Sequence, residues 1–393
     1  MFASPRTAWT HGLVARLLLA LLVGLAVMVW DVAHRPPAAG PAQAVWPQTG
    51  MTASQLLVRQ AQGVIPMPAH TPAAHASSLL AMPARGSDAL LAFWFAGTKE
   101  SAPDIGLAAS GFDRASQQWS PARYVVHREA LGQALGFGVR RIGNPVAWLD
   151  ADQKVHLFVV ATGLGGWAAS RVVHLRQSSA GAGVAELRFE PVRVLPLAWW
   201  WNTSVLVRTA PLPLADGGMV LPVYFELGIK YPVALRFAAR GEFLGLVRMS
   251  QRTHVLQPTL VMQSPTQWLA LMRDQRPKGR VTAAQTQDGG AHWQDLPDLE
   301  LVNPDASVAG LGLAPGRMVL AHNTSPHSRT LLDLSESADG VHWSAVQPLA
   351  HGTGHHEYSY PALAWVDDSL WVSYTDQRQR IAWQRFAAVN SPQ

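Results

Sequence analysis

Residues able to do chemistry gather near the end of the chain. Tyr358 is directly preceded by His355, His356 and Glu357. Tyr360, Arg378 and Arg380 follow it. The order His-His-Glu could suggest a metal site, but successive side chains of a strand point to opposite faces and chelate poorly. We therefore expect no metal and no other cofactor. The tyrosines remain, either as buried aromatics or as reactive phenols.

Two other stretches contain residues that occur in binding sites. The run Trp199 to Asn202 (WWWN) could stack on sugar faces, but a strand buries alternate side chains, so core packing is the simpler interpretation. Gly163 to Trp167 (GLGGW) is too short for a phosphate-binding loop, and no strand-helix-strand pattern surrounds it. The chain contains no cysteine, which excludes disulfides, thiolate catalysis and cysteine-bound metal centres.

The elements that must position such residues are short strands. Several runs of strand length are rich in aromatic and β-branched residues and are bounded by Gly, Pro, Asp or Asn. They are Ala89–Gly97, Lys154–Thr162, Met219–Leu227, Gln267–Asp274, Arg317–Asn323 and Leu370–Asp376. Beyond the N-terminal region no helical period extends over a dozen residues. The pattern predicts an all-β sandwich, barrel or propeller.

A repeated phrase favours the propeller. TQDGGAHW ends at Trp293, and ESADGVHW ends at Trp343, with their aspartates 339 − 288 = 51 residues apart. In such a phrase Asp accepts hydrogen bonds from turn amides, Gly takes a positive φ, and Trp packs between sheets. SGFDRASQQWS, with Asp113 and Trp119, is a degenerate copy. A repeat at this spacing is typical of propeller blades, and it predicts a structural role away from any catalytic centre.

Composition and charge exclude several classes of protein. The 393-residue chain is 48% hydrophobic and 15% charged, which excludes general disorder and allows two or three domains or one large all-β domain. Its net charge is +5, but the basic residues are scattered and form no Lys/Arg run. We therefore expect no nucleic-acid partner.

An apolar segment lies near the N-terminus. Leu17 to Trp30 is uninterrupted and apolar, and about 14 residues suit the core of a signal peptide. The longer segment from Leu13 to Val32 is long enough for a single-pass anchor, because the Arg16 side chain can extend its charge to the membrane interface. We favour an uncleaved signal-anchor over residues 1–34.

This interpretation sets the expected domains and location. The propeller would be exported to the cell envelope, periplasmic or extracellular, and held at the membrane. Cleavage near Ala42 and Ala44, with secretion, is the alternative. Residues 35–51 are rich in Pro and Ala and predict a semi-rigid linker, so the folded domain is expected over 52–393.

The repeated phrases resemble the Asp boxes of the sialidase superfamily. The resemblance covers roughly Ala74 to Phe386, and six segments follow one another in the order found in that family. They are LLAFWFAGTKESAPDIGLAAS, GNPVAW, GGMVLPVYFELG, LQPTLVMQSPTQWLALMRDQR, AHNTSPHSR and EYSYPALAW. The resemblance implies a six-bladed β-propeller with an active site at its central axis.

The resemblance also implies roles for individual residues. In that family three arginines bind the carboxylate of a sialic acid, and planar guanidinium groups do so bidentately. WLALMRDQR resembles the second-arginine strand and places that role on Arg273, and AHNTSPHSR places the third arginine on Arg329. A tyrosine activated by a glutamate attacks the anomeric carbon. This nucleophile falls on Tyr358 in EYSYPALAW, with Tyr360 as the alternative.

Two carboxylates complete the implied site. Asp104 in FAGTKESAPDIG stands near the place of the family's acid/base aspartate, and an aspartate that caps a turn beside Pro103 is the other interpretation. Glu226 in VLPVYFELG falls on the family's central strand near the substrate, where it would contact the sugar or act as a base.

The sequence departs from the family at two positions. The first arginine is replaced by His75 in HASSLL, and a histidine cannot supply a permanently charged fork. The glutamate that assists the tyrosine corresponds to Gln257 in LQPTLV, whose amide cannot take the phenolic proton.

Three functions follow from these observations. We expect a monomeric, exported, sialidase-like exo-glycosidase that acts on a terminal acidic sugar of a glycan. One alternative is a lyase or hydrolase of a uronic-acid polymer on the same fold, and a lyase would form an unsaturated product that absorbs ultraviolet light. The other alternative is a non-catalytic glycan-binding propeller, which Gln257 and His75 favour.

Overall fold

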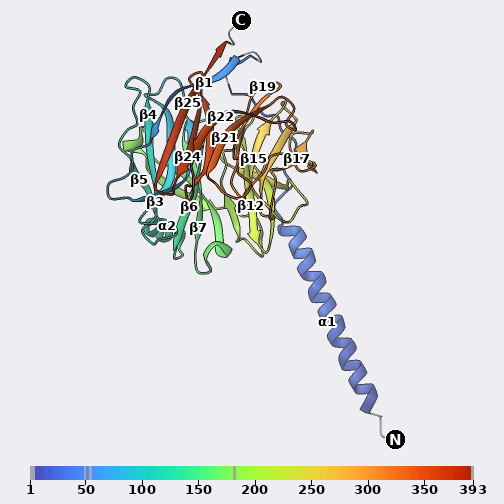
Figure 1. Cartoon of the computed structure of the whole chain (residues 1–393). Coiled ribbons are helices and arrows are strands. Elements are labelled where there is room, and N and C mark those ends of the chain that lie inside the picture. The colour runs from blue at the N-terminus through green and yellow to red at the C-terminus, as the bar shows by residue number, and fades with distance from the viewer. Residues whose placement is uncertain (1–4, 48–49, 53–54, 180–182, 391–393) are drawn as a thin grey trace. The chain divides into compact units, whose positions relative to one another are not determined.

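The strands of the chain are arranged in six antiparallel sheets around a common centre (Figure 1). The computed structural model describes residues 5–47, 50–52, 55–179 and 183–390. It divides into two units, and the larger one runs from Ala38 to Leu195 and from Thr203 onward. The smaller unit contains the N-terminal helix together with residues 196–202.

Each sheet forms one blade of a six-bladed β-propeller, and we number the blades in chain order. Blade 1 is β2 (Ala73–Ala81), β3 (Asp88–Gly97), β4 (Gly106–Asp113) and β5 (Arg123–His127). Blade 2 is β6 (Arg141–Leu149), β7 (Val155–Thr162), β8 (Ser170–Gln177) and β9 (Phe189–Val194). Blade 3 is β10 (Val205–Val207), β11 (Leu212–Pro213), β12 (Met219–Leu227), β13 (Ile229–Phe237) and β14 (Phe243–Arg248).

The remaining blades follow the same plan. Blade 4 is β15 (Val255–Met262), β16 (Trp268–Asp274), β17 (Thr282–Thr286) and β18 (Gln294–Asp295). Blade 5 is β19 (Ala309–Ala314), β20 (Arg317–Asn323), β21 (Leu331–Ser337) and β22 (Ser344–His351). Blade 6 is β23 (Tyr358–Val366), β24 (Ser369–Asp376), β25 (Arg380–Asn390) and, from the other end of the chain, β1 (Gln55–Val64). Short helices lie between strands at α2 (Arg128–Leu135), η1 (Gly166–Ala169) and η2 (Val184–Glu186).

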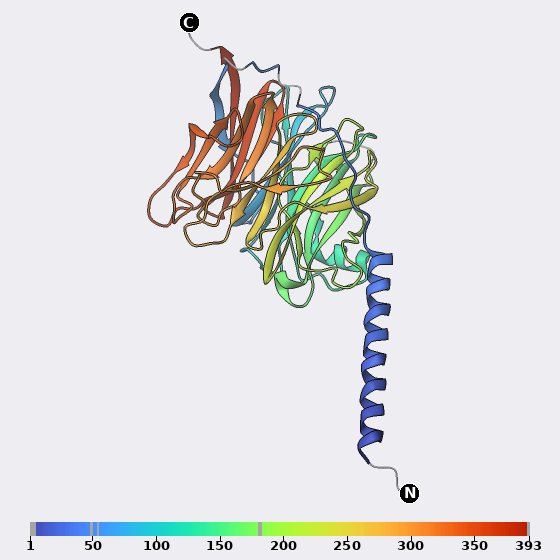
Figure 2. The ribbon, with the colours of Figure 1, turned by 90° about the vertical axis from the view of Figure 1, so that its right-hand side faces the viewer.

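The two ends of the propeller meet in blade 6. Strand β1 pairs antiparallel with β25, with Gln55 opposite Asn390 and Val64 opposite Ala382. Figure 2 shows this pairing of the blue and red strands from a second side. Because the last blade takes its outer strand from the start of the domain, the ring is closed by backbone hydrogen bonds.

The core lies between neighbouring blades, which explains why the strands read as continuous apolar runs. Every residue of β7 is buried, because both faces of this sheet are covered. Side chains of blade 1, such as Phe93, pack in one cluster with those of blade 2, such as Val159. The first strands of the blades lie innermost, and β2 contacts both β6 and β23.

The repeated Asp phrases occupy equivalent turns, each between the third and fourth strand of a blade. In blade 4, Asp288 Oδ1 accepts hydrogen bonds from the Thr286 hydroxyl (2.9 Å) and the His292 backbone N–H (3.0 Å). Trp293 donates its indole N–H to the Gly290 carbonyl at 3.1 Å. Gly290 has φ +89°, and a Cβ there would lie 2.7 Å from the Trp268 ring. The turn therefore requires glycine.

The copy in blade 5 keeps this pattern of hydrogen bonds, and the copy in blade 1 departs from it. Asp339 Oδ1 accepts hydrogen bonds from the Val341 and His342 backbone N–H groups at 2.8 Å, and Trp343 donates to the Gly340 carbonyl at 3.0 Å. In the degenerate copy Asp113 Oδ1 instead accepts from the Ser116 backbone and hydroxyl, at 2.7 Å each.

The segment that the sequence predicts as a linker belongs largely to the folded domain. The Ala42 N–H donates to the Gly289 carbonyl (2.9 Å) and the Ala44 N–H to the Pro265 carbonyl (2.8 Å), so the chain crosses the rim of blade 4. Ala42 and Ala44 are buried. The larger unit begins at Ala38 and therefore includes most of this segment. Small side chains allow this close packing without any apolar period, which is why composition alone suggests a free spacer.

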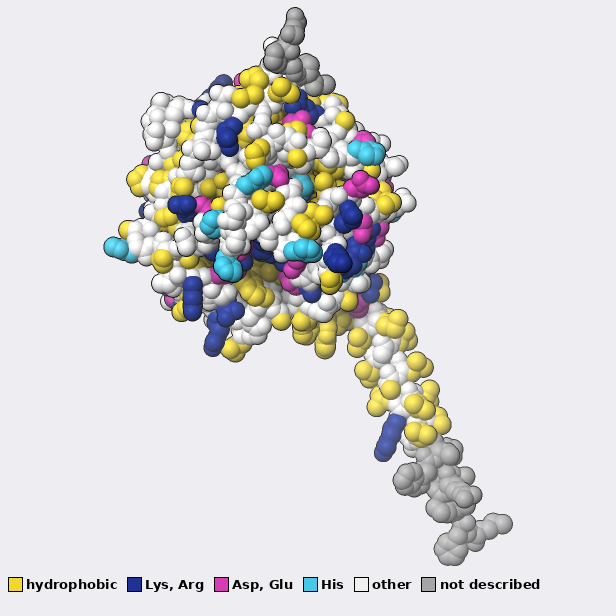
Figure 3. Space-filling model, viewed as in Figure 1, with side chains coloured by type: hydrophobic (Ala, Val, Ile, Leu, Met, Phe, Trp, Pro, Cys, Tyr) yellow, Lys and Arg dark blue, Asp and Glu magenta, His cyan; other side chains and the backbone are white. Residues whose placement is uncertain are grey.

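The helix α1 (Pro5–His34) forms most of the smaller unit. Its residues Gly12–His34 have a mean hydropathy of 2.5 and are not buried against the protein. Figure 3 shows hydrophobic side chains along the part of the helix that is not drawn in grey. The helix is long and apolar enough to cross a membrane, and it is compatible with either a signal sequence or an anchor.

Candidate functional site

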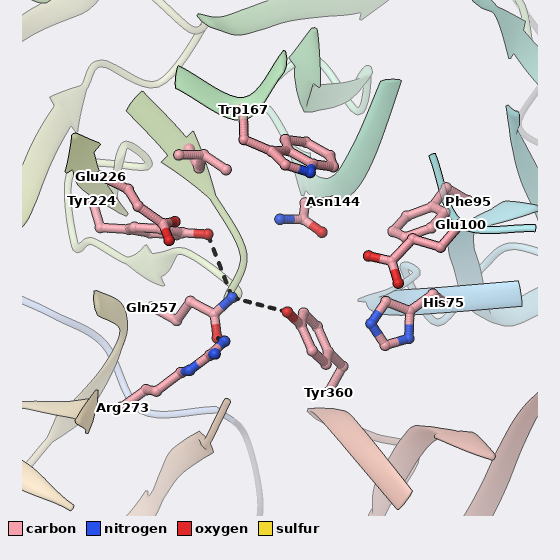
Figure 4. A pocket seen from close by; sticks show the side chains of 11 residues that line it. His75, Phe95, Glu100, Asn144, Trp167, Tyr224, Glu226, Gln257, Arg273 and Tyr360 are labelled. Atoms are coloured by element: carbon pink, nitrogen blue, oxygen red, sulfur yellow. Dashed lines mark hydrogen bonds between the residues drawn. The ribbon is translucent and has the colours of Figure 1, made fainter. Parts of the chain in front are cut away.

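The inner strands surround a pocket of about 190 Å³. Figure 4 shows its side chains converging from blades 1, 2, 3, 4 and 6. They are His75, Phe95, Glu100, Asn144, Trp167, Leu206, Tyr224, Glu226, Gln257, Arg273 and Tyr360. Typical pockets for drug-sized ligands measure about 300–1,000 Å³. The described pocket is therefore suited to a small unit, such as one sugar ring.

A repeated backbone bend directs side chains into this pocket. Four blades have a non-glycine residue with positive φ inside the innermost strand, namely Ala76 (φ 56°), Asn144 (45°), Gln257 (51°) and Tyr360 (54°). In the other two blades Ser204 (64°) and Asp305 (53°) precede that strand. In blades 1, 2, 4 and 6 the pairing with the second strand also shifts register at this bend. Such conformations cost about 1–3 kcal/mol each and concentrate at functional sites. Here they break the strand alternation, and the side chains of Asn144, Gln257 and Tyr360 line the pocket.

Gln257 forms hydrogen bonds with three side chains at the base of the pocket. Its Oε1 accepts a hydrogen bond from Arg273 at 3.0 Å, and because arginine can only donate, the orientation of the amide is defined. Its Nε2 therefore faces the hydroxyls of Tyr360 (3.3 Å) and Tyr224 (3.4 Å) and donates to them. Burial raises the pKa of Tyr224, and the Glu226 charge adds to this, so Tyr224 stays neutral.

Arg208 lies beneath Tyr360 and is fully buried. It donates to the carbonyl oxygens of Ser77 (3.1 Å) and Pro361 (3.0 Å), and no carboxylate of the described residues pairs with it. Burial lowers its pKa to about 10, so it remains charged at neutral pH. Its guanidinium carbon lies 4.9 Å from the centre of the Tyr360 ring. The pocket floor thus contains a positive charge that no carboxylate of the described chain balances.

Arg273 and Asp305 form an ion pair at the pocket. Arg273 Nε donates to Asp305 Oδ1 at 2.6 Å. Although burial alone lowers the pKa of Arg273, the Asp305 bond outweighs it and raises that pKa. Arg273 is therefore a permanent cation, held in place from two sides by Asp305 and Gln257.

An ion-pair cluster borders the pocket on the side of blade 6. Glu357 accepts hydrogen bonds from Arg378 Nε (2.8 Å) and Arg329 Nη1 (3.1 Å), and Arg378 also contacts Glu100. Burial alone raises the pKa of Glu357, but the bonds from Arg378 and the other donors lower it to about 2. The cluster fixes Glu100 at the pocket wall.

His75 is buried beside Tyr360, with ring centres 4.1 Å apart. Neither ring nitrogen has a hydrogen-bond partner among the described residues. Burial, and then the Arg378 charge, lower its pKa well below the usual value, so it is neutral. A buried polar group without a protein partner is costly, and this one faces a pocket from which water or a polar ligand group can reach it.

The structure brings together some of the predicted site residues and not others. His75, Gln257, Glu226 and Arg273 line the pocket. Arg329 does not line it but lies behind Tyr360, 6.0 Å from its ring centre. We keep these roles as predictions about function.

Two predicted catalytic residues lie outside this pocket. Asp104 is exposed and accepts hydrogen bonds from the backbone and hydroxyl of Thr98, at 2.9 Å each, as a carboxylate that stabilises a turn. Tyr358 packs against Tyr374, with ring centres 6.2 Å apart. Tyr358 and Tyr360 would share a face of a regular strand, but the bend at Tyr360 separates them. Tyr360, the alternative nucleophile, is the one that lines the pocket.

Several pocket residues were not predicted as site residues. They are Phe95, Glu100, Asn144, Trp167, Leu206 and Tyr224, together with Arg208 beneath them. One signal was available: Asn144-Pro145, Gln257-Pro258 and Tyr360-Pro361 repeat a polar or aromatic residue before proline near the start of a blade. These positions are three of the six bends.

Comparison with known proteins agrees with this architecture. The chain belongs to the family of BNR repeat-like domains, whose model matches residues 88–372. No curated protein matches the sequence. The fold is that of the sialidases and their structural relatives.

Three solved structures illustrate the likeness. The Hadza microbial sialidase Hz136 is 16% identical, with a TM-score of 0.66 over 81% of this chain and 66% of that one. A protein of unknown function from Dyadobacter fermentans is 13% identical, with a TM-score of 0.67 over 86% of this chain and 100% of that one. The sialidase of Trypanosoma rangeli is 13% identical, with a TM-score of 0.61 over 85% of this chain and 60% of that one. The chain thus spans about two thirds or less of the two sialidases.

Proposed function

We propose that the axial pocket binds one terminal sugar of a glycan and cleaves its glycosidic bond, with acidic sugars as the preferred class. The observation that carries this proposal is the buried His75, which has no hydrogen-bond partner in the described part of the chain and faces a small pocket that also contains Tyr360, Glu226 and Arg273. The cations Arg273 and Arg208 favour a ligand with negative charge. The aromatic side chains of Trp167 and Phe95 offer apolar surface to a sugar ring.

In this proposal Tyr360 is the nucleophile. Its oxygen bonds to the anomeric carbon as the glycosidic bond breaks. Gln257 cannot accept a proton through Nε2, but its N–H donates to the Tyr360 oxygen and, with the Arg208 charge below the ring, favours negative charge there. Glu100, which lines the same pocket, is the group that takes the phenolic proton and returns it when the sugar leaves Tyr360, because the lowered pKa of His75 makes its imidazole a weak base.

Glu226 supplies the proton that the leaving oxygen needs. Burial raises the pKa of Glu226, although Arg273 opposes this, and a raised pKa favours the protonated acid. In the second half of the reaction the Glu226 carboxylate takes a proton from the water that releases the sugar from Tyr360. This assigns the acid/base role to Glu226 in place of Asp104.

A panel of glycans tests the proposal. The full-length protein, solubilised in detergent, is incubated with glycans that end in sialic acid, a uronic acid or a neutral sugar, and the products are identified by mass spectrometry. We expect release of a single acidic monosaccharide by the wild type and none by Tyr360→Phe. Binding without any product in either protein would support a glycan-binding propeller instead.

One observation favours a second candidate, β-elimination at a uronic acid. His75 and Tyr360 are packed together, and Gln257 replaces the carboxylate that a nucleophilic tyrosine would use. Tyr360, as the phenolate left when Glu100 takes its proton, would then remove the proton beside the sugar carboxylate, which Arg273 binds. The bond from the next ring carbon to the glycosidic oxygen would break, and Glu226 would protonate that oxygen. A product that absorbs ultraviolet light identifies this reaction.

We also propose that α1 stays in the membrane and that the propeller is exported. The length and hydropathy of Gly12–His34 support an anchor, and Arg16 lies near its start. The full-length protein should then remain with membranes after extraction at alkaline pH. Soluble protein with an N-terminus near Val45 would instead show cleavage.

A further inference from the structure

A short aromatic segment, Pro196–Asn202, groups with helix α1 and not with the propeller, although it connects β9 to β10. Trp199 donates its indole N–H to the Asp31 carboxylate near the end of the helix. Trp200 packs edge-on against Trp199 and is 78% exposed, and Trp201 is 51% exposed. Large indoles with this exposure are unusual on a protein that contacts only water.

The helix end that Trp199 contacts has the composition of a membrane interface. Trp30 stacks on His34 with ring centres 3.9 Å apart, and Arg35 pairs with Asp31. The apolar stretch Gly12–His34 ends at the same place. Tryptophan is enriched where hydrocarbon meets headgroups, because its ring is apolar and its N–H needs a polar partner. Asp31 provides that partner for Trp199.

We infer that Trp200 and Trp201 insert into the headgroup region of the membrane that α1 crosses. This inference rests on the proposed membrane location of α1. The segment is covalently inserted between blades 2 and 3, so its insertion gives the propeller a second attachment to the bilayer besides the connection after Pro37. Two attachments restrict rotation of the propeller, which one flexible tether would permit. The run WWWN therefore serves neither core packing nor sugar stacking.

Single-cysteine reporters test this inference, because the chain has no natural cysteine. Trp200→Cys and Trp201→Cys in the full-length protein are each labelled with a polarity-sensitive fluorophore. The labelled proteins are reconstituted into vesicles of phosphatidylcholine and phosphatidylglycerol. Val341→Cys is the matched control, because Val341 is 50% exposed in the Asp-box turn of blade 5.

We expect the probes at 200 and 201 to shift to the blue and to be quenched by lipids with a spin label about 5–10 Å below the headgroups. The control probe should respond to aqueous iodide instead. Equal iodide quenching at positions 200 and 341 would overturn the inference. Protection of position 200 by added glycans, without lipid quenching, would overturn it in favour of a sugar-stacking surface. Alkaline extraction of the same samples reports separately on whether α1 is embedded.

Discussion

Arg208 and Tyr360 are stacked at the axis of the propeller, with 4.9 Å between the guanidinium carbon and the ring centre. Arg208 also donates to the carbonyl of Pro361, the residue after Tyr360, so it holds both the ring and the bend of the backbone. A cation below a phenol stabilises negative charge on its oxygen most strongly where water is excluded. In the proposed mechanism the pair therefore stabilises the Tyr360 oxygen as it becomes charged.

Arg208→Met should lower kcat by roughly 10- to 100-fold with a smaller change in KM, because it removes about 1.5–3 kcal/mol of stabilisation that appears as the tyrosine oxygen becomes charged. Arg385→Met is the control, since Arg385 lies 5.5 Å from the Trp371 ring, away from the pocket lining. Melting curves establish that both variants fold. Unchanged kcat in folded Arg208→Met would remove Arg208 from the mechanism.

Replacing each tyrosine of β23 separates the two candidates for nucleophile. Tyr360→Phe should abolish turnover while ligand binding is nearly retained, because only the hydroxyl is lost from the pocket. Tyr358→Phe should retain turnover, since Tyr358 packs against Tyr374 outside the pocket. Steady-state kinetics and calorimetric titration of the same glycan measure both effects. The reverse result would return the role to Tyr358.

Glu226→Gln should lower the turnover of a natural glycoside by roughly 10²- to 10⁴-fold, because the amide keeps the shape of the protonated acid but cannot give up a proton. The turnover of a nitrophenyl glycoside should fall less, because its leaving group needs little protonation. Asp104→Asn is the comparison, and we expect it to affect folding of its turn more than the reaction. Equal losses with both substrates would argue against an acid role for Glu226.

The fold was predictable because its signals are local and repeated. The Asp boxes at Trp293 and Trp343 mark the same turn in blades 4 and 5, and the apolar runs correspond to strands that are covered on both faces. Closure by β1 was not foreseen, since pairing between residues 55 and 390 leaves no periodic trace in the sequence.

The site was harder to predict because it depends on backbone bends. Strand alternation places Tyr358 and Tyr360 on one face, but the positive φ of Tyr360 separates them. Glu100 stands in the same loop as Asp104, and only the ion pair with Arg378, which is far away in the sequence, shows which carboxylate reaches the pocket. Arg208 has no motif and is identified by its burial.

Acid should destabilise the propeller through its buried histidines. Burial lowers the pKa of His174 to about 3 and that of His322 to about 4, from an ordinary value of 6.5. Between pH 6.5 and these lowered pKa values, each histidine is protonated in the unfolded chain and neutral in the folded chain. Stability is therefore full above about pH 6.5 and is lost as the pH falls toward 4. His322→Gln should reduce the difference between the free energies of unfolding at pH 7 and pH 4.5 by up to about 3 kcal/mol, measured by denaturant unfolding. An unchanged pH dependence would show that His322 is protonated in the folded state.

The Asp-box tryptophans should contribute to stability and leave the site unaffected. Trp293 is half-buried and packs against a hydrophobic cluster that includes Leu214, Met249 and Ala44. Trp293→Ala should lower the free energy of unfolding by about 2–3 kcal/mol. This is less than the roughly 3–5 kcal/mol lost with a fully buried indole, because part of the Trp293 ring is already in water. Trp293→Phe should recover part of this loss, since it restores apolar contact but not the bond to Gly290. Ligand affinity per folded molecule should stay the same in both variants, because Trp293 does not line the axial pocket. A large loss of affinity at an unchanged melting temperature would show that the turn takes part in binding.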